Sequence, residues 1–399
     1  KIAQHLQPYV VGPGESWKRS SARLTAITSC LYHARKVGDT VQIPAGVPIT
    51  EDELRELMQF KSFVCTAAPL AASDGRTLAE FLIGNQNMRS MLLYNGTLQD
   101  KGTMAIAATL ALTTPEVSNV VLQTLGIGNH RVGPRGAAAL GNALRAKHCT
   151  LTCLYLENNK EIGDIGIEIL AEALETNVRL EKLVLSSNNV GDKGCCALAD
   201  ALKRNRSLRS LTLNHNKIGF NGFSALIHVM SNRNKTLSTL SIHHNVRISD
   251  AGAEALARYI GPPTAHIIEI DLSSCGINDS GVLSLEKSFL KLIDSGNVTE
   301  EEESDDTSSN YTTEDSSDDA SSVLDVAAFV KDQEDEHSGA AIKLQRLGLC
   351  NNFIHGTAAK RLADVIGQIT NNCALDLEGN PIDAETRGAL IFDTYNKRI

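Results

Sequence analysis

The sequence predicts an α/β solenoid, in which a short strand and a helix alternate along the chain and stack in two layers. Three observations predict this fold. A segment of about twelve residues recurs along the chain, each copy begins with two apolar residues two positions apart, and a helical apolar pattern follows. The copies begin at residues 91, 125, 154, 183, 211, 240, 270, 347 and 375, so most spacings are 28 to 30 residues.

Each copy is expected to begin with a strand and to end in a turn. In the copy LVLSSNNVGDKG at 183–194, Leu183 and Leu185 point to the same side because alternate residues of a strand share a face. An asparagine follows three residues later, where its amide can bond backbone groups that would otherwise be buried unpaired. The turn asparagines are Asn159, Asn188, Asn216, Asn245, Asn352 and Asn380.

A helix is expected after each turn. A glycine precedes the helical pattern in most copies, and Leu198 and Leu202 then recur at helical spacing. One unit cannot bury its apolar face alone, so stacked neighbours must share a continuous core. An eroded copy starts at Phe63, which lies 28 residues before the copy at Met91.

The pattern LxxLxLxxN, with a period of 28–29 residues and one helix in each unit, resembles the leucine-rich repeat family in its ribonuclease-inhibitor-like class. The resemblance covers about 63–290 and 341–390. It implies a horseshoe, with one parallel sheet lining the concave side and the helices outside. Cys275 and His130 replace the turn asparagine; the family accepts cysteine there, whereas His130 indicates an irregular turn.

The pattern divides the chain into four expected regions. Residues 1–62 do not fit the period and are expected to form a helical N-terminal cap, with an amphipathic helix over 15–37. The alternative is a docking helix with Trp17 as its anchor. The other regions are leucine-rich repeats at 63–290, an acidic disordered insertion at 291–343, and C-terminal leucine-rich repeats with a cap at 344–399.

The insertion is strongly acidic. Residues 294–336 contain 16 acidic residues and one basic residue, a net charge of −15, whereas the rest of the chain carries about +6. Such a composition cannot bury enough apolar surface to fold alone, so we expect disorder. The segment is either a tolerated outer loop or an interaction segment phosphorylated by acid-directed kinases. Its candidate phosphorylation sites are Ser304, Thr307, Ser316 and Ser317.

Composition disfavours several classes of protein. The chain has 399 residues, a net charge of −9 and 4% aromatic residues, which is unlike a basic nucleic-acid binder or a base-stacking surface. No apolar run approaches the roughly 18 residues of a membrane span, and residues 1–30 lack a signal-peptide pattern. The nine cysteines lack metal-ligand spacing and are expected to be reduced thiols. A cytoplasmic protein is expected, with a cytoskeletal or ciliary complex as narrower alternatives.

The repeat register predicts which side chains face the concave side. The candidate partner-binding residues are Tyr94, Tyr155, Glu157, Asn158, Asn214, His215, His243, His244, Glu269 and Asp271. His215 and His244 occupy equivalent positions of neighbouring copies, so the sheet spacing places them about 4.8 Å apart, with His243 beside them. A solvated polar patch or a pH-sensitive contact is expected there. A metal ion is the less favoured alternative and no metal ligand is predicted, because the register supplies neither a fourth ligand nor a second shell.

The expected function is that of a non-catalytic protein-interaction module or scaffold subunit. No phosphate loop, GxSxG, HExxH or CxxC pattern occurs, so no catalytic residue, cofactor or enzyme activity is expected. A polar surface with two tyrosines suits a protein partner, and the chain can be a subunit of a larger complex.

Two other functions stay open. A GTPase-activating protein for a Ran-like small GTPase has a similar repeat and an acidic segment, although here that segment lies inside the array. Arg131 and Arg135 are then the candidate accelerating arginines. A sensor domain from a larger nucleotide-binding receptor is the other alternative.

Overall fold

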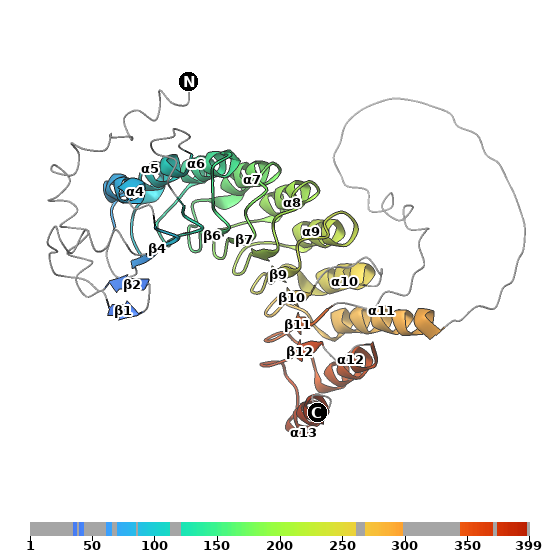
Figure 1. Ribbon diagram of the computed structural model, residues 1–399. Coiled ribbons are helices and arrows are strands. Elements are labelled where there is room, and N and C mark those ends of the chain that lie inside the picture. The colour runs from blue at the N-terminus through green and yellow to red at the C-terminus, as the bar shows by residue number, and fades with distance from the viewer. Residues whose placement is uncertain are drawn as a thin grey trace, which may run out of the picture.

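The computed structural model describes residues 35–37, 40–43, 61–65, 70–84, 87–111, 121–260, 268–297, 344–369 and 373–396. Twelve short strands in this part of the chain form one open sheet in sequence order (Figure 1). The strands are β1 (Arg35–Val37), β2 (Thr40–Ile43), β3 (Ser62–Cys65), β4 (Ser90–Tyr94), β5 (Thr124–Gly128), β6 (Cys153–Tyr155), β7 (Lys182–Val184), β8 (Ser210–Thr212), β9 (Thr239–Ser241), β10 (Glu269–Asp271), β11 (Arg346–Gly348) and β12 (Ala374–Asp376). Every neighbouring pair from β2 to β12 is parallel.

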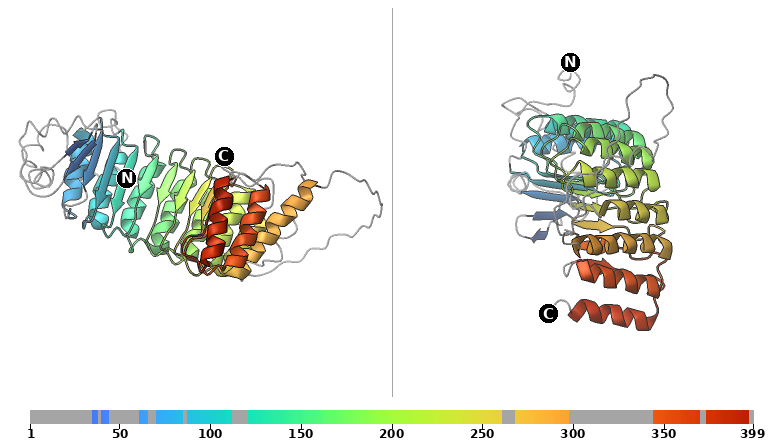
Figure 2. Two further views of the ribbon diagram at one scale, coloured as in Figure 1. Left: turned by 90° about the horizontal axis from the view of Figure 1, so that it is seen from below. Right: turned by 90° about the vertical axis from the view of Figure 1, so that its right-hand side faces the viewer.

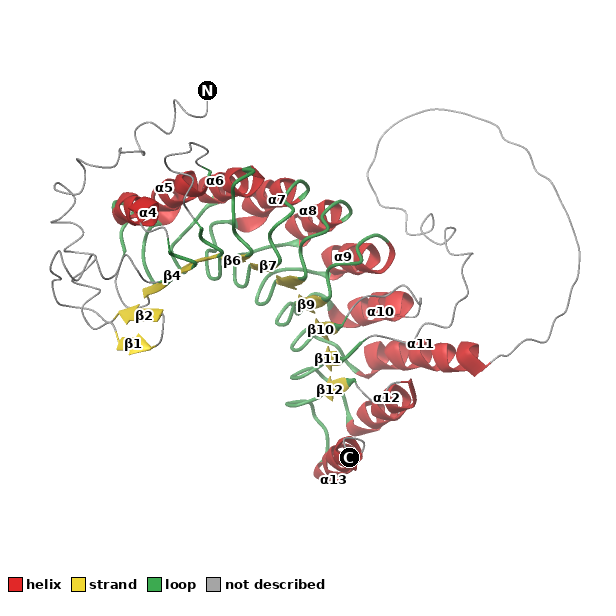
Figure 3. Ribbon diagram, viewed as in Figure 1, coloured by secondary structure: helices red, strands yellow, loops and turns green. Residues whose placement is uncertain are grey.

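The helices form a second layer on the outer side of the curved sheet (Figures 2 and 3). The described helices are α4 (Asp74–Gly84), α5 (Gln99–Leu110), α6 (Pro134–Arg145), α7 (Gly163–Leu174), α8 (Asp192–Leu202), α9 (Phe220–Asn232), α10 (Ser249–Ile260), α11 (Asp279–Asn297), α12 (Gly356–Ile369) and α13 (Ala384–Asn396). None of them is both long and apolar enough to cross a membrane. The predicted horseshoe, with a concave parallel sheet and outer helices, is therefore confirmed.

The strand register agrees with the predicted repeats. Leu183 of β7 lies opposite Leu211 of β8, and both are buried against the helix layer. Phe63 of β3 lies opposite Met91 of β4, which confirms the eroded copy. The core is therefore continuous from repeat to repeat. Each leucine removed from water at these positions stabilises the fold by about 1.5–3 kcal/mol.

The sheet continues across the insertion without a break in register. Ile270 of β10 lies opposite Leu347 of β11, as if the residues between them were a single repeat. Helix α11 runs to Asn297 and so passes the expected boundary at residue 290. Residues 298–343 lie outside the described residues, and the four candidate phosphorylation sites with them.

The N-terminal edge of the sheet differs from the expected helical cap. Strands β1 and β2 form an antiparallel pair, and β2 adds to β3 in parallel with Val41 opposite Phe63. The predicted helix over 15–37 is therefore wrong at its end, because residues 35–37 are a strand. A strand pair satisfies the backbone groups that the open edge of β3 would otherwise expose. Residues 1–34 and 44–60, which include Trp17, lie outside the described residues.

The turn asparagines bond the backbone of their own repeat and of the preceding one, except that the Nδ2 of Asn188 has no hydrogen-bond partner among the described residues. The Asn216 Oδ1 accepts hydrogen bonds from the backbone N–H groups of Asn188 (2.9 Å) and Val190 (3.0 Å). Its Nδ2 donates to the backbone oxygens of Leu185 (3.0 Å) and Leu213 (2.9 Å). Asn159, Asn352 and Asn380 bond in the same way. The asparagine side chain thus stabilises the turn of its own repeat and links it to the turn of the preceding repeat.

An aspartate at the start of one helix caps the next helix. The Asp164 Oδ1 accepts from the N–H groups of Gly191 (2.6 Å) and Gly194 (3.1 Å), at the N-terminus of α8. A Cβ added at Gly194 would lie 2.8 Å from that oxygen, so the close approach requires glycine. Asp100 makes the same arrangement two repeats earlier, and Asp192 makes it one repeat later.

A second asparagine series, which sequence reasoning missed, lies at the other end of the helices. The Asn205 Nδ2 donates to the Leu174 oxygen (2.8 Å), and its Oδ1 accepts from the Leu208 N–H (2.8 Å). Asn177 and Asn234 occupy the equivalent positions and make equivalent bonds. The 28- and 29-residue spacings of these asparagines were the signal for this series.

His130 occupies the place of a turn asparagine and is fully buried. The Leu98 N–H lies 3.4 Å from its Nδ1. Burial lowers the pKa of His130 to about 4, against a smaller raising effect of the Leu93 backbone. The turn is not irregular, contrary to the sequence expectation, because Asn129 and Arg131 have the same left-handed φ as Ser187 and Asn189.

Replacement of a turn asparagine is expected to weaken the stack. Asn216→Ala leaves two backbone N–H groups and two oxygens without their partner, so we expect a loss of roughly 3 kcal/mol in the free energy of unfolding. Urea denaturation measures this loss. Asn221→Ala, at an exposed position of α9, is the control and should change stability by less than about 0.5 kcal/mol. Equal effects of the two changes would contradict the role of Asn216.

His130→Asn is expected to protect the fold at acidic pH. The His130 pKa is about 4 in the folded chain and about 6.5 unfolded, so the unfolded chain takes up the proton first as pH falls. The wild type should therefore lose roughly 2 kcal/mol more than the variant between pH 7.5 and pH 5. Denaturation curves of both proteins at the two pH values measure the difference. Parallel losses would show that His130 does not titrate this way.

Candidate functional site

All ten predicted residues lie on or just after the strands of the concave sheet, and none is buried. Tyr94, Tyr155 and Asp271 are the last residues of β4, β6 and β10, and Glu269 is the first residue of β10. Two residues after β6, β8 and β9 lie Glu157, Asn214 and His243. The next position after each of these holds Asn158, His215 and His244. The strand pairs place Tyr155 and Asp271 in one column of equivalent positions that runs across the sheet. The repeat spacing therefore brings side chains of separate repeats onto one surface.

The position after the concave column has a left-handed backbone in every copy. Asn158, His215 and His244 have φ angles of 58°, 55° and 58°. The complete series is Asn95, Asn129, Asn158, Ser187, His215, His244, Ser274, Asn351 and Gly379. Asparagine and glycine adopt this conformation at low cost, which explains why they predominate.

Tyr94 lies against strand β5 where that strand has no side chains. A Cβ added at Gly128 would lie 2.5 Å from the Tyr94 ring and 3.5 Å from the Glu157 Oε2. On the far side of Glu157, the Lys182 Nζ lies 5.4 Å from the centre of the Tyr155 ring. We call Tyr94, Tyr155, Glu157 and Lys182 the tyrosine–glutamate group.

The carboxylate of this group is poorly compensated. Its Oε2 atom is buried and accepts no hydrogen bond from the described residues. Burial raises the pKa of Glu157, and a hydrogen bond from its own backbone N–H and then the Lys182 charge oppose that shift only in part. Burial also raises the pKa of Tyr94 to about 12, with further contributions from Glu157 and Tyr155. The folded chain therefore holds a desolvated negative charge on its concave surface.

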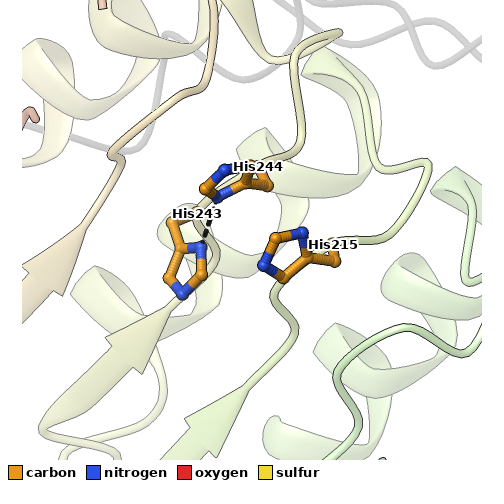
Figure 4. A group of neighbouring side chains, drawn as sticks. All are labelled: His215, His243 and His244. Atoms are coloured by element: carbon orange, nitrogen blue, oxygen red, sulfur yellow. Dashed lines mark hydrogen bonds between the residues drawn. The ribbon is translucent and has the colours of Figure 1, made fainter. Parts of the chain in front are cut away.

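The three predicted histidines meet where β8 and β9 end (Figure 4). The Nδ1 atoms of His243 and His244 are 2.7 Å apart, and the His215 ring stacks on the His244 ring with centres 4.1 Å apart. The Asn214 Oδ1 accepts from the His243 N–H (3.1 Å) and from the Ser241 hydroxyl (2.9 Å), which joins the two strands here.

Arg346 and Asp376 belong to the concave surface but were missed by sequence reasoning. Arg346 of β11 makes ion pairs with Glu269 of β10 (3.1 Å) and Asp376 of β12 (2.8 Å). These two ion pairs, with the Asp376 hydrogen bond first, raise the pKa of Arg346. Continuing the predicted columns across the insertion would have placed both residues beside Glu269 and Asp271.

A parallel sheet with outer helices and shared turn asparagines defines the class: the chain is a leucine-rich repeat protein. Two family models match it, the TMOD/LMOD Leucine-rich domain over residues 137–265 and the Leucine Rich repeat over 265–285.

Several known proteins are similar to parts of the chain. The mouse protein "NACHT, LRR and PYD domains-containing protein 5" is 27% identical over 248 residues, which cover 55% of this chain and 21% of that protein. The chain thus spans about a fifth of that relative's length. The yeast Rad7–Elc1 complex structure has a TM-score of 0.50 at 13% identity and covers 84% of this chain and 68% of its own. The leiomodin-1 actin-binding site 2 structure has a TM-score of 0.31 at 19% identity, with coverages of 41% and 92%.

Removing the charge of Glu157 is expected to stabilise the free protein. Because its folded pKa is raised, ionisation costs the folded chain more than the unfolded chain, so stability falls as pH rises through this range. Glu157→Gln should raise the melting temperature at pH 7.5, and the gain should shrink as the pH approaches 4. Glu168→Gln, exposed on α7, is the control and should change neither the melting temperature at pH 7.5 nor its dependence on pH. A lower melting temperature for Glu157→Gln at pH 7.5 would contradict the unpaired carboxylate.

Proposed function

We propose that the chain is a non-catalytic interaction module or scaffold subunit whose concave face binds a protein partner with exposed basic side chains. The observation that supports it most is the Glu157 Oε2 atom, which is buried and accepts no hydrogen bond from the described residues. Such a carboxylate costs stability in the free protein, and the positive charge of a partner's lysine or arginine placed beside it would lower that cost.

The aromatic neighbours favour the same kind of partner. Tyr155 ends β6 two residues before Glu157, and Tyr94 ends β4, two strands away. The faces of both rings attract cations. The Lys182 ammonium already lies over the Tyr155 ring at 5.4 Å. A basic side chain from a partner would meet one ring face and one carboxylate, which is a common combination at protein interfaces.

The charge of the surface extends this argument along the sheet. Strands β4 to β12, with the two residues after each, carry five carboxylates and two basic side chains. The carboxylates are Glu157, Glu269, Asp271, Asp376 and Glu378, and the basic residues are Lys182 and Arg346. The surface is also preorganised, because backbone pairing and the turn asparagines hold its strands, so little entropy is lost on binding.

The acidic segment 294–336 is proposed to assist the same interaction, on its composition alone. A net charge of −15 attracts basic surfaces over about a Debye length, and phosphorylation at Ser304, Thr307, Ser316 or Ser317 would increase it. Because the concave face is also acidic, we do not expect the acidic segment to bind to the concave face of its own chain. We also propose that the chain is a subunit of a larger complex in the cytoplasm.

Partner capture by concave and outer variants tests the proposal. The whole chain, a 294–336 deletion, Glu157→Lys and Glu168→Lys would be used for affinity capture with cross-linking mass spectrometry. We expect cross-links from one partner to lysines near the concave strands, such as Lys182. Glu157→Lys should weaken capture at least tenfold because it places a positive charge against the basic partner, whereas Glu168→Lys on α7 should not.

Three results would count against the proposal. Equal capture by Glu157→Lys and Glu168→Lys would place binding on another surface. A partner lost only when 294–336 is deleted would place it on the acidic segment. Recovery of a small GTPase whose hydrolysis the chain accelerates would replace the scaffold by the GTPase-activating alternative.

A further inference from the structure

Three imidazole rings converge between the ends of β8 and β9 (Figure 4). His215 follows β8, and His243 and His244 follow β9. Each ring offers a nitrogen, and one nitrogen from each lies within 4.8 Å of the others. Within the described residues this is the one group of three or more histidine, cysteine or carboxylate side chains close enough to share an ion.

The nitrogen spacing is close to that of a shared metal ion. Zinc–nitrogen bonds of about 2.0–2.1 Å in a tetrahedron place the nitrogens about 3.4 Å apart. The His243 and His244 Nδ1 atoms are 2.7 Å apart, and one nitrogen from each of the three rings lies within 4.8 Å of the others. These values lie on both sides of the ideal one, so small side-chain rotations reach it. In neutral rings, one proton lies between the two Nδ1 atoms, and a metal ion can replace it.

The surroundings of His243 and His244 disfavour their protonated form. Burial lowers the pKa of His243 and of His244, and neighbouring histidines lower both further. Deprotonated imidazole is the form of histidine that binds metal ions. Asp271 on β10 acts in the opposite direction on both pKa values, which places a negative charge near the cluster and would offset the charge of an ion.

The backbone directs the rings toward one another. His215 and His244 have φ angles of 55° and 58°, at a position that holds asparagine, serine or glycine in the other copies. A left-handed histidine is less common than a left-handed asparagine and carries a small conformational cost. The Asn214 Oδ1 fixes the His243 backbone from the neighbouring strand. The ligand set is therefore formed before any ion arrives.

We propose that His215, His243 and His244 form a three-histidine site for a divalent transition-metal ion, with Zn²⁺ as the preferred ion. Imidazole ligands suit zinc, copper and nickel, and three protein ligands with an open position are typical of zinc sites that take a water or an external ligand. His215 and His244 are exposed, so the open position faces the concave space. A fourth ligand from this chain is not required. The site does not depend on the proposed partner, since it is complete in the free chain.

Zinc titration of the full chain and of matched variants tests the site. His215→Asn and His244→Asn each remove one ligand, and asparagine already occupies the same left-handed position at Asn95, Asn129 and Asn158. His148→Asn, exposed after α6, is the control. Isothermal titration calorimetry measures the affinity, and circular dichroism confirms that the variants are folded. A Co²⁺ absorption spectrum separates imidazole ligands from thiolates.

We expect one equivalent of Zn²⁺ to bind the wild type and the control equally, and at least about tenfold more weakly to each cluster variant. The Co²⁺ complex should lack a thiolate charge-transfer band, since burial raises the pKa of thiols such as Cys195 and Cys275. Equal affinity of the wild type and the cluster variants would overturn the proposal. A thiolate band that persists in both variants, or a dissociation constant weaker than about 1 mM, would also overturn it.

Discussion

The turn asparagine is the interaction on which the rest of the structure depends. Asn216 bonds the turn of its own repeat and the turn before it, so neither repeat satisfies its backbone alone. The Asp164 cap and the Asn205 series couple neighbours in the same way at the two ends of the helices. Stability is therefore shared between adjacent units, and the strand spacing that builds the concave surface follows from these contacts.

The repeat could be predicted because each copy meets the same physical demands. Leu183 and Asn188 have equivalents at a nearly constant spacing, so the register of neighbouring strands follows directly. The strand pair at residues 35–43 could not be predicted in this way. It lies outside the period, and its place is set by the open edge of β3 and not by any pattern of its own. A helical pattern over 15–37 was locally reasonable but took no account of that edge.

The candidate site was predictable as columns of residues but not as chemistry. The register placed Tyr155 and Asp271 in one column, and it placed His215 beside His244. It could not show that one oxygen of Glu157 is buried without a partner, because that depends on how the Tyr94 ring covers two glycines of β5. Nor could it give the orientation of the imidazole rings, which depends on side-chain torsions and on the left-handed backbone.

The two faces of the sheet differ in what their side chains contribute to stability. On the helix side, leucines and amide groups are buried and bonded, so almost every side chain contributes to the stack. On the concave side, the strands are already held by their neighbours, so a side chain there can lower the stability of the chain without preventing it from folding. The unpaired Glu157 carboxylate and the left-handed His215 and His244 are tolerated for this reason. The positions equivalent to His215 and His244 hold asparagine, serine or glycine in the other repeats, and those equivalent to Glu157 hold residues as different as Tyr94 and Ser186. The fold therefore does not need these three side chains, which agrees with the binding roles proposed for them.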